Sequence, residues 1–231
     1  MERTPFEQHL TQLKWRQGEH IFIAGATGTG KTTIAARLLE KRSHVLGFGV
    51  KIYDPTLSRD FGDWAKVESL RDVRSWMNRV ILWPRLKRGE SADSWQARQR
   101  AEFRHAMNLI MTDRNWCVFL DELSYMANPQ LGGCANEIAT IHQIGRSSGH
   151  SVLSLAQRPA WIPQAVLANV SHAYIGRTRK AEDIKRLSDL AGSELNPKDF
   201  AQMLGSLEKR QDFMYVPTLG DGQLEVVNTR F

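Results

Sequence analysis

The fold of this chain is decided by the stretch Gly25-Ala26-Thr27-Gly28-Thr29-Gly30-Lys31-Thr32. It matches the pattern G-x-x-x-x-G-K-[ST], in which the backbone N–H groups of a glycine-rich loop surround phosphate oxygens. The Lys31 ammonium can reach the β- and γ-phosphates of a nucleotide, and the Thr32 hydroxyl can ligate Mg²⁺. We therefore expect the segment from Gly25 to Thr33 to bind a nucleotide.

The segments on either side of this loop have the patterns of a strand and a helix. Residues 21–24 are a short apolar run typical of a buried strand, and residues 32–41 carry apolar side chains at helical spacing. A loop in this context places the positive end of a helix dipole beside the phosphates. The context favours a phosphate site over a glycine-rich turn that binds nothing.

Strand-like and helix-like segments alternate through most of the remaining chain. Predicted strands cover residues 45–53, 79–83, 116–120, 151–156 and 172–176. Predicted helices cover residues 91–111, 135–144 and 180–190. Residues 212–216 and 224–227, with Gly220-Asp221-Gly222 between them, predict a hairpin. This order indicates an α/β fold with a mainly parallel sheet, helices on both faces and a C-terminal β-hairpin, where ligands bind at the carboxyl ends of strands.

A second candidate element follows the predicted strand 116–120, which ends at Asp121-Glu122. This is the arrangement of a Walker B motif, in which Asp121 holds Mg²⁺. The Glu122 carboxylate can act as the general base that polarises the water attacking the γ-phosphate. An aspartate alone would also fit a kinase or a GTPase, so the pair favours nucleotide hydrolysis.

Two further predicted site residues flank the strand 151–156. Gln157 follows it, and its amide can bond the γ-phosphate or the attacking water. Arg146 lies on a glycine-flanked turn before the strand, and we expect it near the functional edge of the sheet, where it can serve as an arginine finger across a subunit boundary. Arg177 and Arg179 are the next candidates for that role, and we expect Arg158 to face solvent.

Length and composition favour a single domain over residues 1–231, since 42% of the residues are hydrophobic and 24% are charged. No apolar run has the length of a membrane span, and the N-terminus lacks a secretory signal, so we expect a cytoplasmic protein with no membrane span of its own. Cys117 and Cys134 have no partners at metal-site spacing and are predicted to be core thiols.

The charge balance favours a polyanionic partner. Lys and Arg total 31 against 25 Asp and Glu, which gives a net charge of +6. Two basic clusters are candidates for phosphate contacts, residues 85–88 and the set Arg98, Arg100 and Arg104, although such clusters are more often a solvated face.

The combined motifs resemble the FtsK/HerA superfamily of DNA-pumping P-loop ATPases. The resemblance rests on the loop 25–32, on Leu120-Asp121-Glu122, on Gly145-Arg146-x-x-Gly149 and on Gln157-Arg158-Pro159-x-x-Ile162-Pro163, and it covers about residues 18–192. A C-terminal helix and hairpin over about 193–231 complete the chain. The short chain is most similar to the genome-packaging ATPases of membrane-containing double-stranded DNA viruses.

The resemblance implies a RecA-like core and ATP hydrolysis with Mg²⁺. It also implies a homo-oligomeric ring, commonly of six subunits, that translocates double-stranded DNA and meets capsid or vertex proteins in the host cytoplasm or the virion. By position, Lys31 and Thr32 would bind nucleotide and metal, Glu122 would be the catalytic base, Gln157 the sensor and Arg146 the finger. No N-terminal barrel or DNA-reading winged helix fits in this length.

Other readings stay open at this stage. A cellular or plasmid-borne translocase of the same superfamily, acting in repair or conjugation, fits the same motifs. A small-molecule P-loop kinase fits the size and the loop, but it leaves Glu122 and Gln157 unexplained. A GTPase would need a base-reading Asn-Lys-x-Asp motif, and residues 196–199 have those letters in the wrong order. A nucleotide switch without turnover is disfavoured by Glu122.

Overall fold

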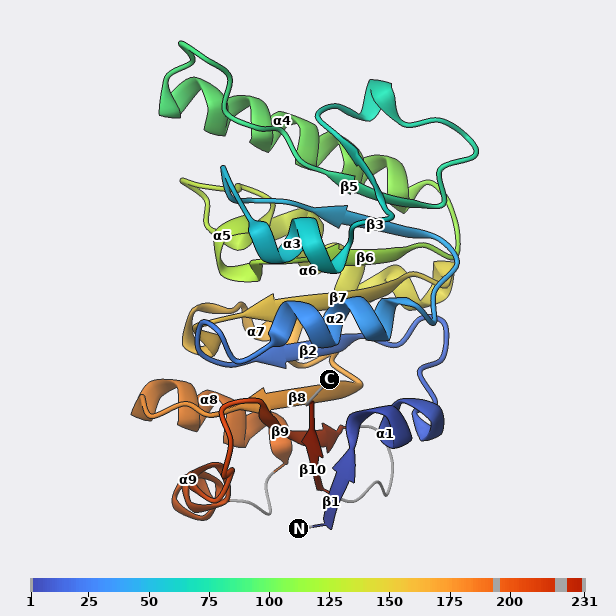
Figure 1. Cartoon of the computed structure of the whole chain (residues 1–231). Coiled ribbons are helices and arrows are strands. Elements are labelled where there is room, and N and C mark those ends of the chain that lie inside the picture. Colours follow the sequence, from blue (N-terminus) through green and yellow to red (C-terminus); the bar gives the residue numbers. More distant parts are fainter. Residues whose placement is uncertain (1, 193–195, 219–223, 230–231) are drawn as a thin grey trace.

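The computed structural model describes residues 2–192, 196–218 and 224–229, and a ten-stranded sheet lies at its centre (Figure 1). The strand order is β1-β10-β9-β8-β2-β7-β6-β3-β5-β4. From β8 to β4 all neighbouring strands are parallel, and β9 runs antiparallel to both β8 and β10. The predicted α/β fold with a mainly parallel sheet is confirmed. The number of domains stays a prediction.

The strands are β1 (Glu2–Pro5), β2 (Ile21–Ala24), β3 (Val45–Phe48), β4 (Ala65–Val67), β5 (Arg79–Leu82), β6 (Cys117–Leu120), β7 (Ser151–Ala156), β8 (His172–Gly176), β9 (Asp212–Pro217) and β10 (Glu225–Asn228). The α-helices are α1 (Phe6–Gln12), α2 (Lys31–Leu39), α3 (Pro55–Asp60), α4 (Ala92–Met111), α5 (Leu123–Ala127), α6 (Ala135–Ile144), α7 (Gln164–Leu167), α8 (Ala181–Ala191) and α9 (Pro197–Gly205). Short 3₁₀ turns cover Leu70–Asp72, Gly145–Ser148 and Pro159–Trp161.

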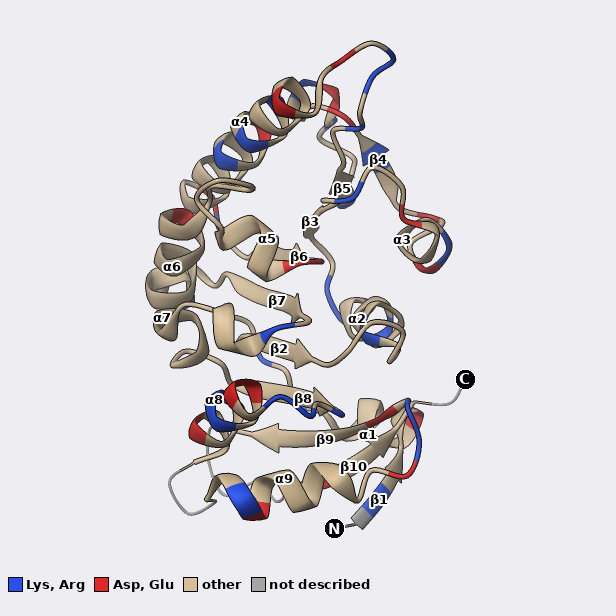
Figure 2. Ribbon diagram, turned by 90° about the vertical axis from the view of Figure 1, so that its left-hand side faces the viewer, with Lys and Arg blue, Asp and Glu red and all other residues tan. Residues whose placement is uncertain are grey.

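Helices cover both faces of the sheet, with α4 to α7 on one side and α2 and α3 on the other (Figure 2). Successive side chains of a strand point to opposite faces. In β2, Ile21 and Ile23 therefore pack into the core beneath α2 and α3, whereas Phe22 and Ala24 pack beneath α4, α6 and α7. Because both faces are covered, β2 is buried along its whole length, as its continuous apolar run predicted.

One predicted strand is much shorter in the structure. The strand expected over 45–53 ends at Phe48, because the chain then turns outward to begin α3. Asp54 caps that helix by accepting a hydrogen bond from the Leu57 N–H at 2.9 Å, and Pro55 occupies its first turn. The hairpin is present as the antiparallel pair β9 and β10, while its expected turn residues 220–222 lie outside the described residues.

The register of the sheet brings the motif-bearing loops together at the carboxyl ends of four neighbouring parallel strands. Ala24 of β2 pairs with Ala156 of β7, and Leu120 of β6 pairs with Phe48 of β3. The residues that follow these four strands therefore emerge next to one another. Across the described ranges, no helix is both long and apolar enough to cross a bilayer.

Candidate active site

The glycine-rich loop turns sharply between β2 and α2. Gly28 and Gly30 have φ values of 75° and 94°, in the left-handed region that disfavours side chains, and Gly30 is the residue directly before α2. Thr29 is buried, and its hydroxyl donates to the Ala26 carbonyl at 2.9 Å. The Thr29 hydrogen bond thus stabilises the turn of the loop, and α2 begins directly where the loop ends.

The Lys31 side chain lies within the loop it belongs to. Its Nζ donates to the carbonyl oxygens of Gly25 at 2.8 Å and Ala26 at 3.1 Å. Burial lowers the pKa of Lys31, and the nearby Glu122 and Asp121 carboxylates oppose that shift. The ammonium therefore lies against the backbone of the loop itself.

Asp121 and Thr32 face each other across the site. The Thr32 hydroxyl lies 3.5 Å from Asp121 Oδ1, and the Asp121 side chain is 2% exposed. Burial raises the pKa of Asp121 to about 6. A hydroxyl and a buried carboxylate are oxygen donors of the kind that Mg²⁺ takes, together with water and phosphate oxygens, so the predicted pair fits this metal.

Glu122 directly follows Asp121 and is partly exposed toward the cavity. The Ser124 hydroxyl donates to its Oε1. Gln157 reaches the loop from β7, because its Oε1 accepts a hydrogen bond from the Thr27 hydroxyl at 2.9 Å. The two predicted reactive side chains therefore come from adjacent strands to the same cavity.

That cavity has a volume of about 630 Å³. Of the predicted site residues it is lined by Thr27, Gly28, Gly30, Lys31, Thr32, Thr33, Asp121, Glu122 and Gln157. Three other residues of the loop do not line the cavity: Gly25, Ala26 and Thr29. Predicted residues from three separate parts of the sequence thus meet in one cavity, which is large enough for a nucleotide.

The expected position of Arg146 is wrong. Arg146 lies in the 3₁₀ turn that precedes β7, whereas Gln157 follows β7. The two residues therefore lie at opposite ends of this strand (Figure 1). A six-residue strand is roughly 20 Å long, so Arg146 cannot reach the loop of its own chain. Arg177 and Arg179, which follow β8, lie at the same edge as the loop.

Arg158 is also placed differently from the expectation. Its Nε lies 3.1 Å from Oδ2 of Asp183, whose side chain is 1% exposed, and its guanidinium stacks over Trp161 at 4.7 Å. The Ala160 N–H donates to the other Asp183 oxygen at 3.0 Å. Arg158 therefore binds the segment after Gln157 to α8, and the expectation that it contacts only solvent is wrong.

Several cavity residues were missed by the sequence reasoning: Lys51, Thr56, Arg59, Gln211 and Thr229. Arg210 was missed as well, although its guanidinium donates to the Thr27 carbonyl and lies over Gly28. Lys51 could have been found from its place near the end of the predicted strand 45–53, just before the Asp54-Pro55 pair. Arg210 and Thr229 carry no such signal, because they reach the loop only through the pairing of β9 and β10 with the sheet.

The cysteines and the arginines of the long helix do not line the cavity. Cys117 and Cys134 are buried and free, as predicted for core thiols. Within the basic clusters, Arg98 pairs with Glu90 at 2.8 Å and Arg104 pairs with Glu137 at 2.9 Å. These ion pairs on α4 and its surroundings favour the solvated-face interpretation for both arginines.

No family model matches the sequence, and a search of curated proteins gave no match. Solved structures do match. The genome-packaging NTPase B204 from Sulfolobus turreted icosahedral virus 2 superposes with a TM-score of 0.65 at 12% identity, covering 94% of this chain and 99% of that one. The chain has the fold of the FtsK/HerA-type P-loop ATPases.

Two other structures with this fold come from different systems. VirB4 of Thermoanaerobacter pseudethanolicus gives a TM-score of 0.61 at 12% identity, covering 92% of this chain and 89% of that one. The pCW3 conjugation coupling protein TcpA gives 0.54 at 17% identity, covering 93% of this chain and 61% of that one. The B204 NTPase has also been solved with AMPPCP and with ATP-gammaS. The resemblance inferred from the motifs is confirmed at the level of the fold.

Proposed function

We propose that this chain hydrolyses ATP with Mg²⁺ to move double-stranded DNA, as the motor of genome packaging. The observation that carries the proposal is the meeting of Lys31, Asp121, Glu122 and Gln157 in one cavity beside the glycine-rich loop. Phosphoryl transfer depends on positioning and on charge stabilisation, and these side chains supply both.

Each residue has a defined part in the proposed reaction. Lys31 would bind the β- and γ-phosphates, since its ammonium needs only to exchange two loop carbonyls for phosphate oxygens. Thr32 and Asp121 would hold Mg²⁺, which when bound neutralises charge on the phosphates. Glu122 would take a proton from the attacking water, with Ser124 orienting its carboxylate.

Gln157 is the residue proposed to report the nucleotide state. Its amide oxygen accepts from the Thr27 hydroxyl, and its amide nitrogen could donate to a γ-phosphate oxygen that enters the loop. The next residue, Arg158, is tied to Asp183 at the start of α8. Movement of Gln157 would therefore be passed to α8.

The DNA partner and the ring are supported less directly. A net charge of +6 favours binding of a polyanion. The six-membered ring is proposed from the resemblance, and because Arg146 lies so far from its own loop, it could act as a finger only on the nucleotide of a neighbouring subunit. Capsid or vertex proteins, in the host cytoplasm or in the virion, would complete the assembly.

The test of this function is ATP turnover by the purified chain with and without long double-stranded DNA. A DNA-driven motor predicts turnover that rises several-fold when duplex is added. Turnover that is unchanged by DNA would favour an ATPase that serves another process. The absence of turnover under both conditions would contradict the proposal.

A second candidate is a conjugation translocase. It is favoured by the structural similarity to the conjugation coupling protein TcpA, which extends over 93% of this chain. The genes beside this one separate the two functions, since capsid genes indicate packaging and relaxase genes indicate conjugation. The same cavity would hydrolyse ATP in either case.

A further inference from the structure

Lys51 places a second lysine ammonium inside the phosphate cavity. It follows β3, which is the direct neighbour of β6 in the sheet, so it emerges beside Asp121. The Lys51 Nζ lies 2.5 Å from Asp54 Oδ2 and 3.5 Å from Asp121 Oδ2. Its side chain is 47% exposed, which leaves the ammonium room to move.

The two carboxylates that hold Lys51 differ in what else binds them. Asp54 is fixed, because its other oxygen accepts the Leu57 N–H that caps α3. Asp121 faces the Thr32 hydroxyl, which is where the metal is proposed to bind. Among the described residues, Lys51 makes the one ion pair within 4 Å of Asp121. In the structure Lys51 thus supplies the positive charge that a bound metal would bring.

The other cations at the cavity, within the described part of the chain, have partners of their own. Lys31 donates to two carbonyl oxygens of the loop. The Arg59 Nε is paired with Asp60 at 2.6 Å and the side chain is 71% exposed. Arg210 is bonded to the Thr27 carbonyl on the loop itself. Among the residues that the structure describes, Lys51 is the cation that forms an ion pair with Asp121, and the Asp121-Glu122 pair marks the side of the cavity where the γ-phosphate would react.

We propose that Lys51 is a further phosphate-binding residue of this chain, whose ammonium leaves Asp121 and contacts the γ-phosphate when metal and nucleotide bind. The inference rests on the proposed function. A divalent ion beside Asp121 would repel the Lys51 ammonium. Asp54 stays in place as the cap of α3, so the ammonium would turn toward a γ-phosphate oxygen in the cavity. ADP lacks that phosphate, so Lys51 would favour ATP over ADP and stabilise charge during hydrolysis.

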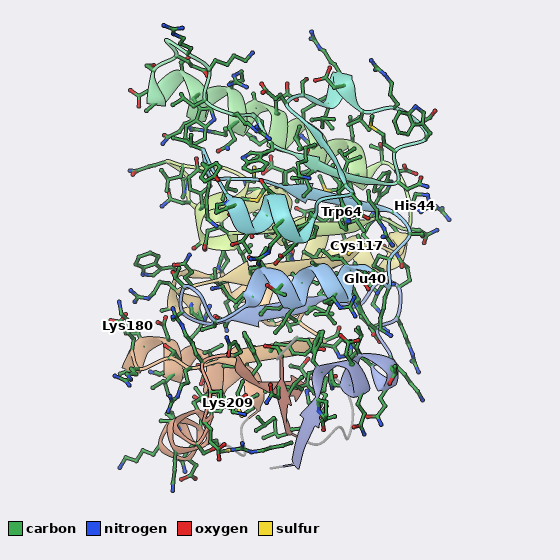
Figure 3. All side chains as sticks on the ribbon, viewed as in Figure 1. Glu40, His44, Trp64, Cys117, Lys180 and Lys209 are labelled. Atoms are coloured by element: carbon green, nitrogen blue, oxygen red, sulfur yellow. The ribbon has the colours of Figure 1, made fainter. Side chains whose placement is uncertain are left out.

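The test compares the binding of AMPPCP and of ADP, each with Mg²⁺, to the wild type and to Lys51→Met. We expect AMPPCP binding to weaken roughly tenfold or more, as for loss of one hydrogen bond to a charged group, and ADP binding to change less than about twofold. ATP turnover should also fall at least tenfold. Lys180→Met is the matched control, because Lys180 is an exposed lysine at the start of α8 that does not line the cavity (Figure 3).

Asp54→Asn separates phosphate binding from a structural role of Lys51. Asparagine also caps helices, so α3 should keep its first turn while the ion pair to Lys51 is lost. A phosphate-binding Lys51 predicts that Asp54→Asn keeps the preference for AMPPCP over ADP. It also predicts that Lys51→Arg has most of the preference that Lys51→Met loses.

The proposal is overturned if Lys51→Met keeps that preference, or if Asp54→Asn loses it to the same extent. A wild type that binds neither nucleotide would overturn the proposed function and this inference together, whereas normal wild-type binding with an unchanged Lys51→Met overturns the inference alone.

Discussion

At Arg158 a side chain expected in solvent forms an ion pair with a nearly inaccessible carboxylate. The Asp183 side chain is 1% exposed and takes hydrogen bonds from both Arg158 and the Ala160 N–H. A buried charge that loses its partner is costly, even where the intact pair adds little to stability. The Gln-Arg-Pro motif therefore joins a residue that faces the cavity to one that anchors the segment.

We predict that Arg158→Ala lowers the free energy of unfolding by about 3 kcal/mol, because Asp183 is left buried and unpaired. Adding Asp183→Ala should recover part of that loss, since the stranded charge is removed. Urea denaturation of the two single variants and the double variant measures the coupling. Arg179→Ala, an exposed residue nearby, should change the stability by less than about 0.5 kcal/mol. Additive losses in the double variant would contradict the ion-pair interpretation.

At the scale of elements, two buried histidines join β2, α6 and β7. His20, just before β2, accepts the Val152 N–H at 3.1 Å, and its other ring nitrogen lies 3.2 Å from the carbonyl of His142 in α6. Burial lowers the pKa of His20 to about 4 and that of His142 to about 3. Both rings are therefore neutral in the folded chain at neutral pH.

We predict that these histidines make the fold sensitive to acid. Their folded pKa values lie below the unfolded value near 6.5, so unfolding takes up protons below that pH. Their contribution is fully present above pH 6.5 and is lost as pH falls toward 4, by roughly 1.4 kcal/mol per pH unit for each ring. His142→Phe should flatten the dependence between pH 6 and 5 in urea denaturation, and the exposed His105→Gln should not. Equal slopes in wild type and His142→Phe would contradict the assignment.

The elements that the sequence could predict are those whose pattern is local. Residues 21–24 and 117–120 are buried on both faces and are continuously apolar, so both strands were found to within one residue. β1 and α3 were missed, because β1 depends on pairing with β10, more than two hundred residues away, and α3 is a short helix fixed by the Asp54 cap. The positions of Arg210 and Thr229 beside the loop depend on such long-range pairing as well.

At the scale of the whole molecule, the proposed partner is duplex DNA. Contacts from Lys and Arg to phosphates release counterions, so binding should weaken steeply with salt and depend little on sequence. Titrating salt against two unrelated duplexes of equal length measures both properties. A slope near zero, or a strong preference for one duplex, would contradict a motor that tracks the phosphate backbone.

The proposed role of Arg146 as an arginine finger predicts that active sites are shared between subunits. Arg146 lies about one strand length from its own loop, so a role as arginine finger requires that it act on the nucleotide of a neighbouring subunit. Arg146→Ala should lower turnover by about 10³-fold, in the range known for arginine fingers. Mixing it with Glu122→Gln should restore part of the activity, because some interfaces then pair an intact Arg146 with an intact Glu122. Mixed assemblies without activity would transfer the role to Arg177 or Arg179.

The central claim is that the cavity beside the glycine-rich loop binds and hydrolyses ATP, and it is tested most directly by measuring ATP affinity and turnover separately in Glu122→Gln. We predict near wild-type affinity, because the phosphate loop is unchanged, and turnover reduced by about 10²-fold or more, because the general base is lost. Lys31→Ala serves as the reference that loses binding itself. Wild-type turnover in Glu122→Gln would contradict the claim.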